Sequence, residues 1–309
     1  MPVHDQDTKD VLSVFEFFEM LPDEQSAIEF IESVRWPDGV ACPRCKSART
    51  KKIANQKRYN CNDCRRQFSV RTGTVFEKSR IPLRKWLYAL YMLQTARKGI
   101  SSIQLGKELG LSQKSAWFML HRIREAMDPG LDLLSGEIEV DEAYVGGAEK
   151  NKHANKKLHK RWIEGKQIVL GMRERDGRIV LRPVHSGEKV VIADEVLFTI
   201  EKGSTIYTDE GNAYRDLHLW YTHETINHGI GEYVRQEITT NGMESVWAIV
   251  KRAHKGVYHH WSKKHGARYL NEVAYRLIEG NVQIPIMIRI KKLAQRSFDV
   301  QLTYKELTR

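Results

Sequence analysis

The hydrophobic and polar positions of residues 11–127 repeat with the period of amphipathic helices. Each helical stretch is bounded by turn or capping residues, which favour short helices over one long one. The helices are expected on either side of a break at Leu21-Pro22 within 11–35, over Leu83–Arg97, near Ser101–Leu109, and from Ser112 to Met127, with a turn at Gly110.

From about residue 136 the apolar residues alternate with polar ones, as in half-buried strands. The segment GEIEVDEAYV predicts a strand, and QIVLGMRERDGRIVLRPV predicts a hairpin that turns at Asp176-Gly177. The helix VIADEVLFTI, the strand STIYTDE and the helix MESVWAIVKRAH follow. Strands followed by alternating helix and strand indicate an α/β domain. The basic segment Lys150–Lys166 is expected to be an inserted loop, either a solvated charge run or a DNA-contacting arm.

Length and composition restrict the class of protein. A chain of 309 residues is too long for one small core, and 41% apolar with 29% charged residues is ordinary for a globular protein. No apolar run approaches the roughly 18 residues of a membrane helix. The N-terminus MPVHDQDTKD is polar and acidic, unlike a secretory signal. We therefore expect a cytoplasmic protein that makes no membrane contact.

The charge is unevenly distributed along the chain. The first 40 residues carry ten acidic side chains against Lys9 and Arg35, a net charge of −8. Because the whole chain has a net charge of +11, the remaining 269 residues carry +19. Such a basic body favours a polyanionic partner, of which nucleic acid is the usual one.

The four cysteines form two CxxC pairs separated by fifteen residues, a spacing typical of a structural zinc site. Each pair directs two thiolates at one ion, and four thiolates leave no open position for catalysis. Coincidence and a redox dithiol are the alternatives. Basic residues on and between the pairs make DNA contact plausible for this zinc ribbon. The expected zinc ligands are Cys42, Cys45, Cys61 and Cys64.

The segment GISSIQLGKELGLSQKSAWFMLHRIREAM fits a helix–turn–helix. Its expected core is Ile103, Leu105, Leu109, Leu111, Ala116, Trp117, Leu120 and Ile123. The exposed face of the second helix would then carry Gln113, Lys114, Ser115, Phe118, His121 and Arg122. Of these, Gln113, Lys114, Ser115 and Arg122 are the candidates for DNA contact. The alternative is a small helical bundle that contacts no groove.

Three acidic residues occupy distinctive positions in the α/β domain. Asp141 lies within the first strand, Asp209 ends a later strand, and Glu244 begins a helix. Lys251 follows Glu244 by seven residues, which places both on one side of that helix. Carboxylates are natural ligands for Mg²⁺ or Mn²⁺, and two such ions can promote phosphoryl transfer.

The order and spacing of these carboxylates resemble the DDE transposases of the RNase H-like superfamily. More narrowly, the chain resembles the IS1595 (ISXO2-like) insertion-sequence transposases over nearly its whole length. The motifs that carry the resemblance are RWPDGVACPRC, YNCNDCRRQFSVRTGTVFEKSR, VDEAYVGG, YTDEGNAY, TNGMESVWAIVKR and HGARYLNEVAYR.

The resemblance implies a multidomain α/β protein in which a zinc ribbon and helix–turn–helix precede an RNase H-like catalytic domain. Asp141, Asp209 and Glu244 would hold Mg²⁺ or Mn²⁺, with Asn241 as the alternative third ligand. Lys251, helped by Arg252, would contact DNA phosphate; His223 and His228 lie in a segment similar to one in the family. The expected segments are 1–40 (acidic, helical), 41–80 (ribbon), 81–130 (helix–turn–helix), 136–285 (catalytic) and 286–309 (tail).

The expected function is therefore a transposase of bacterial origin, associated with the nucleoid. It would bind double-stranded DNA at terminal inverted repeats, cleave 3′ ends and join them to target DNA. Because two ends must be held together, a homodimer or higher oligomer is expected on DNA. Two rivals remain: a catalytically silent DNA-binding regulator derived from a transposase, and a nuclease or RNase H-type hydrolase of the same fold.

Overall fold

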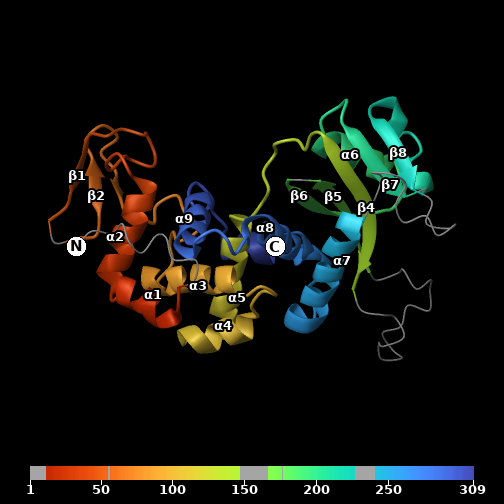
Figure 1. Cartoon of the computed structure of the whole chain (residues 1–309). Coiled ribbons are helices and arrows are strands. Elements are labelled where there is room, and N and C mark those ends of the chain that lie inside the picture. Colours follow the sequence, from red (N-terminus) through yellow and green to blue (C-terminus); the bar gives the residue numbers. More distant parts are fainter. Residues whose placement is uncertain (1–11, 55, 147–165, 176, 210, 227–240) are drawn as a thin grey trace. The chain divides into compact units, whose positions relative to one another are not determined.

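The chain folds into two compact units (Figure 1). In this computed structural model the described residues are 12–54, 56–146, 166–175, 177–209, 211–226 and 241–309. One unit combines residues 1–127 with Glu279–Arg309, and the other comprises Asp128–Ile278. Within the described part of the chain, no helix has the length and apolar content needed to cross a bilayer.

The first unit begins with two short helices, α1 (Val14–Met20) and α2 (Glu24–Arg35). Each starts with a capping box, in which an N-cap side chain and a side chain of the first turn satisfy free backbone N–H groups. The N-caps are Ser13 and Asp23, so the predicted break between the helices is confirmed. Glu24 also accepts hydrogen bonds from the first N–H groups of the next helix in the unit, at Leu83 and Arg84.

A three-stranded antiparallel sheet follows, formed by β1 (Thr50–Lys52), β2 (Tyr59–Cys61) and β3 (Gln67–Phe68). Its small core is aromatic. The rings of Tyr59 and Phe68 stack with centroids 5.5 Å apart, and Trp36 meets both edge-on. So small a sheet buries little apolar surface, which is why a module of this kind needs a metal for stability.

The helix–turn–helix is confirmed as a backbone arrangement. Its helices are α3 (Leu83–Thr95), α4 (Ser102–Leu109) and α5 (Gln113–Glu125). The Ser112 hydroxyl caps α5 as predicted, accepting the Ser115 N–H at 3.2 Å. The expected core was wrong at Ile103, which is 59% exposed. Two residues further on, Leu105 is buried, and a two-residue step turns a helix by about 200°.

The C-terminal residues, expected to be a tail, form helices α9 (Ile286–Arg296) and α10 (Tyr304–Thr308). Helix α9 packs against α2 and α3 in the first unit. The buried Arg289 side chain donates a 3.1 Å hydrogen bond to the carbonyl of Gln94, at the end of α3. The division of the chain therefore differs from the five consecutive segments expected, because the last one returns to the first unit.

The second unit is built on a five-stranded sheet, with strand order β6-β5-β4-β7-β8. Strand β5 is antiparallel to β4 and β6, whereas β4, β7 and β8 are mutually parallel. The strands are β4 (Glu137–Val145), β5 (Gln167–Glu174), β6 (Ile179–Val184), β7 (Thr205–Asp209) and β8 (Thr222–Ile226). The predicted α/β class is confirmed; β8 was not predicted.

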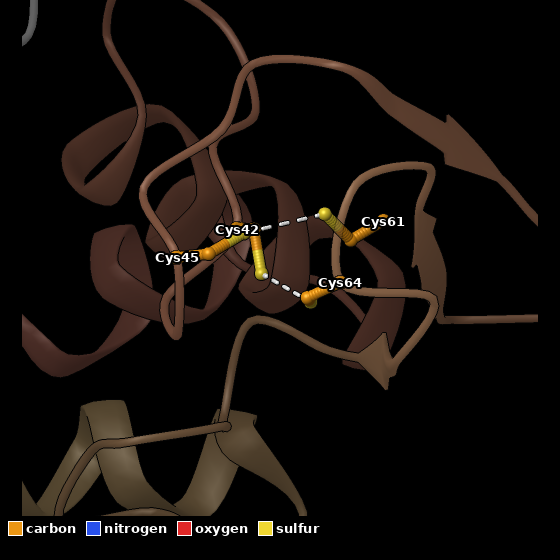
Figure 2. A group of neighbouring side chains, drawn as sticks. All are labelled: Cys42, Cys45, Cys61 and Cys64. Atoms are coloured by element: carbon orange, nitrogen blue, oxygen red, sulfur yellow. Dashed lines mark hydrogen bonds between the residues drawn. The ribbon is translucent and has the colours of Figure 1, made fainter.

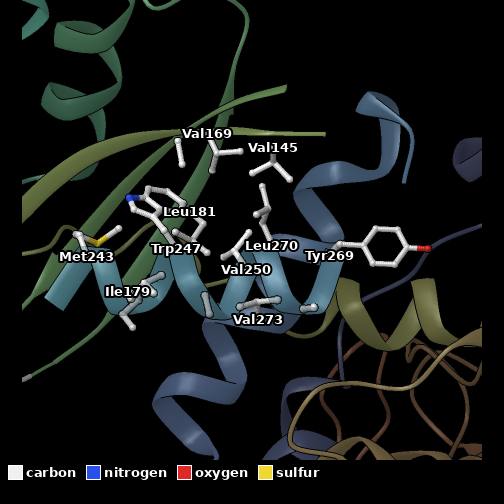
Figure 3. Packing of buried hydrophobic residues seen from close by; sticks show 14 of the residues in the cluster. Val145, Val169, Ile179, Leu181, Met243, Trp247, Val250, Tyr269, Leu270 and Val273 are labelled. Atoms are coloured by element: carbon white, nitrogen blue, oxygen red, sulfur yellow. The ribbon is translucent and has the colours of Figure 1, made fainter. Parts of the chain in front are cut away.

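Helices cover both faces of this sheet. One face packs on α6 (Lys189–Thr199) and the short 3₁₀ helices η4 (Asn212–Tyr214) and η5 (Leu217–Leu219). The other packs on α7 (Asn241–Ala253), a π-helical turn η7 (His254–Tyr258) and α8 (Gly266–Glu279). Figure 3 shows Trp247 and Val250 of α7 and Leu270 of α8 against strand residues Val169 and Leu181. These two layers fix α7 over the strands that carry the candidate chemistry.

Candidate active site and zinc ribbon

Alternation along β4 sends Asp141 and Glu142 to opposite faces of the sheet. Asp141 faces α7, where its Oδ2 atom accepts a 2.8 Å hydrogen bond from the indole N–H of Trp247. The backbone N–H of Glu142 donates to the other oxygen of Asp141, also at 2.8 Å. Glu142 points to the α6 face and accepts a hydrogen bond from the hydroxyl of Tyr214. Asp141 is therefore the member of this pair that faces α7.

Asp209 ends β7, the neighbour of β4 on the opposite side from β5. The last paired row of the two parallel strands joins Glu139 to Tyr207, so two residues further on Asp141 corresponds to Asp209. A two-residue step returns to the same face of a strand. The Oδ1 atom of Asp209 accepts the Gly211 N–H at 3.0 Å, which orients its carboxylate. The sheet thus brings two carboxylates, 68 residues apart in sequence, into one row.

Helix α7 supplies the third acidic residue. Glu244 is exposed in the first turn of α7, one turn before Trp247. Glu244, Trp247 and Lys251 line one cavity of about 980 Å³ together with Asp141. The predicted common side of Glu244 and Lys251 is therefore confirmed.

Close packing brings α7 down onto the sheet at Gly171, the residue that pairs with Asp141 across β4 and β5. A Cβ atom at Gly171 would lie 2.2 Å from the Met243 side chain and 2.6 Å from the Trp247 ring. Glycine is required here because any side chain would push Trp247 away from Asp141.

The carboxylates act on one another electrostatically. Burial raises the pKa of Asp141, and the hydrogen bonds from Trp247 and from the Glu142 N–H oppose that rise. The negative charges of Asp209 and Glu244 raise the pKa further. Burial also raises the pKa of Glu142, whereas its bond from the Tyr214 hydroxyl lowers it. Negative charge gathered in this way is relieved by a cation, and carboxylate oxygens are the donors that Mg²⁺ and Mn²⁺ prefer.

The three carboxylates are less closely grouped than the four cysteines. Within the described ranges, only the four cysteines bring three or more possible metal-ligand atoms within 4.8 Å of one another. Asp141, Asp209 and Glu244 are thus close enough to couple electrostatically but are more widely spaced than the cysteines. Nothing is described of the Asn241 side chain, at the start of α7.

Basic residues line the cavity beside the acidic ones. Besides Lys251, they are Lys166 and Lys255, with His254 and His259 at the π-helical end of the wall. Arg252 is exposed, but it is absent from this lining because one residue turns a helix by about 100°. The basic segment 150–166 lies outside the described residues except for Lys166.

His223, on β8, belongs to the other side of the sheet. Its Nε2 atom hydrogen-bonds the hydroxyl of Thr208 at 2.9 Å, and its strand position pairs with Ile206, whose side chain lies in the α6-facing core. Burial lowers the pKa of His223. His228 lies outside the described residues.

The four cysteine sulfurs meet at one point of the ribbon (Figure 2). The Sγ atoms of Cys42 and Cys64 are 3.7 Å apart, and those of Cys45 and Cys61 are 3.5 Å apart. A tetrahedral zinc ion with Zn–S bonds of about 2.3 Å separates its sulfurs by about 3.8 Å. The donor set and its spacing therefore fit structural zinc.

The two halves of this metal site repeat one backbone conformation. The residue that follows the second cysteine of each pair has a positive φ, 61° at Lys46 and 55° at Arg65. This left-handed conformation is unfavourable for residues other than glycine, asparagine and aspartate. Each half turns sharply at that residue, which lets both cysteines of the pair face the same point.

The candidate DNA-contacting residues of α5 fall into two groups. Gln113 and Lys114 are exposed in the first turn, and Ser115, half-buried, caps it with Ser112. The amide of Gln113 donates to the Ser102 hydroxyl, and the Lys114 ammonium lies 5.0 Å from the centre of the Tyr304 ring of α10.

The expected exposure of His121 and Arg122 was wrong, since they are 0% and 5% exposed. The Arg122 guanidinium donates to the carbonyl of Glu77 at 2.6 Å and lies over the rings of Trp86 and Phe118. Burial lowers the pKa of Arg122 to about 10. The second half of α5 is thus enclosed by α3 and by the segment before it, and Arg122 holds the helix in place.

Two family models and a relative match this chain. Residues 133–277 match the family described as the ISXO2-like transposase domain, and residues 22–67 match the transposase zinc-ribbon domain. A relative described as an uncharacterized protein in transposable element ISH50, from Halobacterium salinarum, is 31% identical over 252 residues. The match covers 76% of this chain and 85% of that protein. The organism of the relative is an archaeon, contrary to the bacterial source expected from the sequence.

Proposed function

Because the chain belongs to the ISXO2-like transposase family, we propose that it is a DDE-type transposase that cleaves 3′ ends at terminal inverted repeats and joins them to target DNA. The observation that carries the proposal is the position of Asp141. It is half-buried, hydrogen-bonded to Trp247 of α7, and lines a cavity shared with Glu244 and Lys251. We propose a cytoplasmic location, because a transposase acts on DNA and, in a cell without a nucleus, the DNA lies in the cytoplasm.

Asp141, Asp209 and Glu244 would hold the catalytic Mg²⁺ or Mn²⁺, which supplies charge neutralisation and an activated attacking oxygen. Lys251, which lines the same cavity as Asp141, would bind the phosphate next to the scissile bond. We favour Glu244 over Asn241 as the third ligand because Glu244 is a carboxylate and lines the cavity. An inactive Asn241→Ala variant beside an active Glu244→Ala variant would reverse that choice.

The zinc ribbon and the first turn of α5 would recognise the transposon ends. The ribbon carries exposed basic residues around its metal, and the polar first turn of α5 is the part of a helix–turn–helix that reaches base edges. Gln113, Lys114 and Ser115 are the residues proposed for this contact. Because transposition requires two ends in one complex, we expect a dimer or higher oligomer on DNA.

The test is cleavage of a labelled duplex that carries the inverted repeats flanking the gene. We expect Mg²⁺-dependent 3′-end cleavage, followed by joining to a plasmid target, with both steps abolished by Asp141→Asn. Glu137→Asn serves as the control, since it changes an exposed acidic residue four positions before Asp141 on the same strand. Unaltered cleavage by Asp141→Asn would refute the proposed active site.

The same experiment separates the two rival functions. Metal-independent binding of the ends without cleavage would identify a regulator. Cleavage without any joined product would identify a hydrolase that uses the same fold.

A further inference from the structure

The proposed metal ligand Glu244 stands on the first turn of a helix, and the position of that turn depends on another buried acid. Glu139 lies two residues before Asp141 on β4, on the same α7-facing side, and is 3% exposed. Its Oε2 atom accepts the backbone N–H of Met243, in the first turn of α7, at 2.8 Å. The N–H of Gly242 stabilises the same carboxylate.

The surroundings of Glu139 offset part of the cost of burying its charge. Burial raises the pKa of Glu139, and the Met243 N–H and the charge of Arg173 oppose that rise. Arg173 is its partner across β4 and β5, and the guanidinium lies 3.9 Å from the Glu139 carboxylate. The start of α7 contributes the positive end of the helix dipole. Gly242 leaves room for this contact, because a Cβ atom at that position would lie 2.5 Å from Oε2 of Glu139 and 1.6 Å from Nη1 of Arg173.

Glu139 and Asp141 form a two-point attachment of α7 to β4. The first point joins Glu139 to Met243, and the second joins Asp141 to Trp247. Two residues along a strand advance about 6.6 Å, and four along a helix advance about 6 Å, so the two contacts repeat at nearly equal spacing. Glu244 lies between the two helical contacts, which fixes its place along the strand.

We propose that Glu139 is a positioning residue, which holds the first turn of α7 so that Glu244 stays beside Asp141. The inference rests on the proposed function, because Glu244 matters in this way only as a metal ligand. Glu139 itself is enclosed between strand and helix and is absent from the cavity lining, so it is not expected to bind the ion.

The test measures Mn²⁺ binding by the full-length, zinc-loaded chain, through loss of the electron paramagnetic resonance signal of free Mn²⁺. Glu139→Gln keeps the volume and one acceptor oxygen but removes the charge. We expect the dissociation constant for Mn²⁺ to rise by about tenfold or more, as for other residues that orient metal ligands. The maximal rate of end cleavage at saturating Mn²⁺ should stay within about twofold of the wild type.

Glu137→Gln is the matched control. Glu137 lies on the same strand as Glu139 and also has an arginine partner, Arg175, together with the hydroxyl of Tyr207. In the described structure it has no hydrogen bond or ion pair with α7. We expect its Mn²⁺ affinity to equal that of the wild type. Gly242→Ala provides a second variant if Glu139→Gln fails to fold, because its methyl group displaces the same carboxylate from the helix side.

An unchanged Mn²⁺ affinity in whichever of these variants folds would overturn the role of Glu139. Failure of the proposed function gives a different result. In that case Asp141→Asn would not differ from the wild type in Mn²⁺ binding or in its action on the transposon ends, whether or not the wild type cleaves them.

Discussion

The indole N–H of Trp247 donates a 2.8 Å hydrogen bond to Oδ2 of Asp141, joining helix α7 to the central strand of the five-stranded sheet. The donor favours the ionised carboxylate, because it lowers a pKa that burial raises. Trp247 is therefore both a core residue and a neighbour of the proposed metal site.

Trp247→Phe should make cleavage more sensitive to acid. The variant keeps an aromatic ring but loses the donor, so the pKa of Asp141 should rise. The acid limb of the rate-against-pH profile should move upward by roughly half to one pH unit, since one hydrogen bond is worth about 1 kcal/mol. Trp220→Phe, which alters a half-buried ring on the α6 face, is the control. An acid limb that does not move would contradict the prediction.

Asp141→Asn should stabilise the metal-free protein at neutral pH. The folded state raises the pKa of Asp141 above 3.8, so the native protein binds this proton more tightly than the unfolded chain does. Stability therefore falls as pH rises from 3.8 through the folded pKa, and the loss persists at pH 7. Asparagine avoids that loss, which we expect to be on the order of 1 kcal/mol.

Thermal unfolding of the zinc-loaded protein, in buffer without added Mg²⁺ or Mn²⁺, measures this difference. The extra stability of Asp141→Asn should shrink as pH falls toward 3.8. Saturating Mn²⁺ should make the wild type the more stable of the two, because only the wild type is stabilised by binding the ion. Asp194→Asn, on the exposed side of α6, is the control. Lower stability of Asp141→Asn at pH 7 would show that the carboxylate is not under electrostatic stress.

Arg65→Gly should strengthen the zinc ribbon. Glycine adopts the positive φ of this position without the cost of about 1 kcal/mol that a side chain incurs. The gain should appear as slower loss of zinc to a chelator at fixed temperature. Arg66→Gly removes an equal charge next to it, where no positive φ is required, and should show no such gain. Equal rates of zinc loss in the two variants would exclude backbone strain as the cause.

Arg122 and Lys114 should separate folding from DNA binding. Arg122→Ala removes a buried guanidinium and leaves the Glu77 carbonyl without its donor, so we expect about 2–3 kcal/mol of destabilisation in urea unfolding. Lys114→Gln should leave that unfolding curve unchanged and weaken binding to inverted-repeat DNA, with a smaller dependence on salt. Full stability of Arg122→Ala would refute its structural role.

The features that the sequence predicts well are those with a local signal. Cysteine spacing locates the zinc site, Ser112 marks the start of α5, and alternation within GEIEVDEAYV predicts strand β4. In each case the residues that give the signal lie close together in the sequence, within one CxxC pair, one helical turn or one strand. The resemblance to transposases then assigned chemistry to residues far apart in the sequence.

The features it misses depend on distant partners. Arginine is a residue type usually found on the surface, but the guanidinium of Arg122 donates to the carbonyl of Glu77, 45 residues earlier. Glu139 is separated by 104 residues from the N–H group of Met243 that it accepts. A charged residue is predicted to be exposed unless such a partner is known. The hydrophobic and polar pattern around Arg122 and around Glu139 does not indicate either partner. The one available signal for Glu139 was its two-residue spacing from Asp141.

The return of residues 279–309 to the first unit has a consequence for biosynthesis. Leu293, fully buried in α9, completes a core whose other helices leave the ribosome much earlier. The second unit, by contrast, is contiguous in sequence and has all its described strands and helices before residue 280. On the ribosome, the unit that carries the zinc ribbon therefore finishes folding only after the second unit has been synthesised, although its own synthesis begins first.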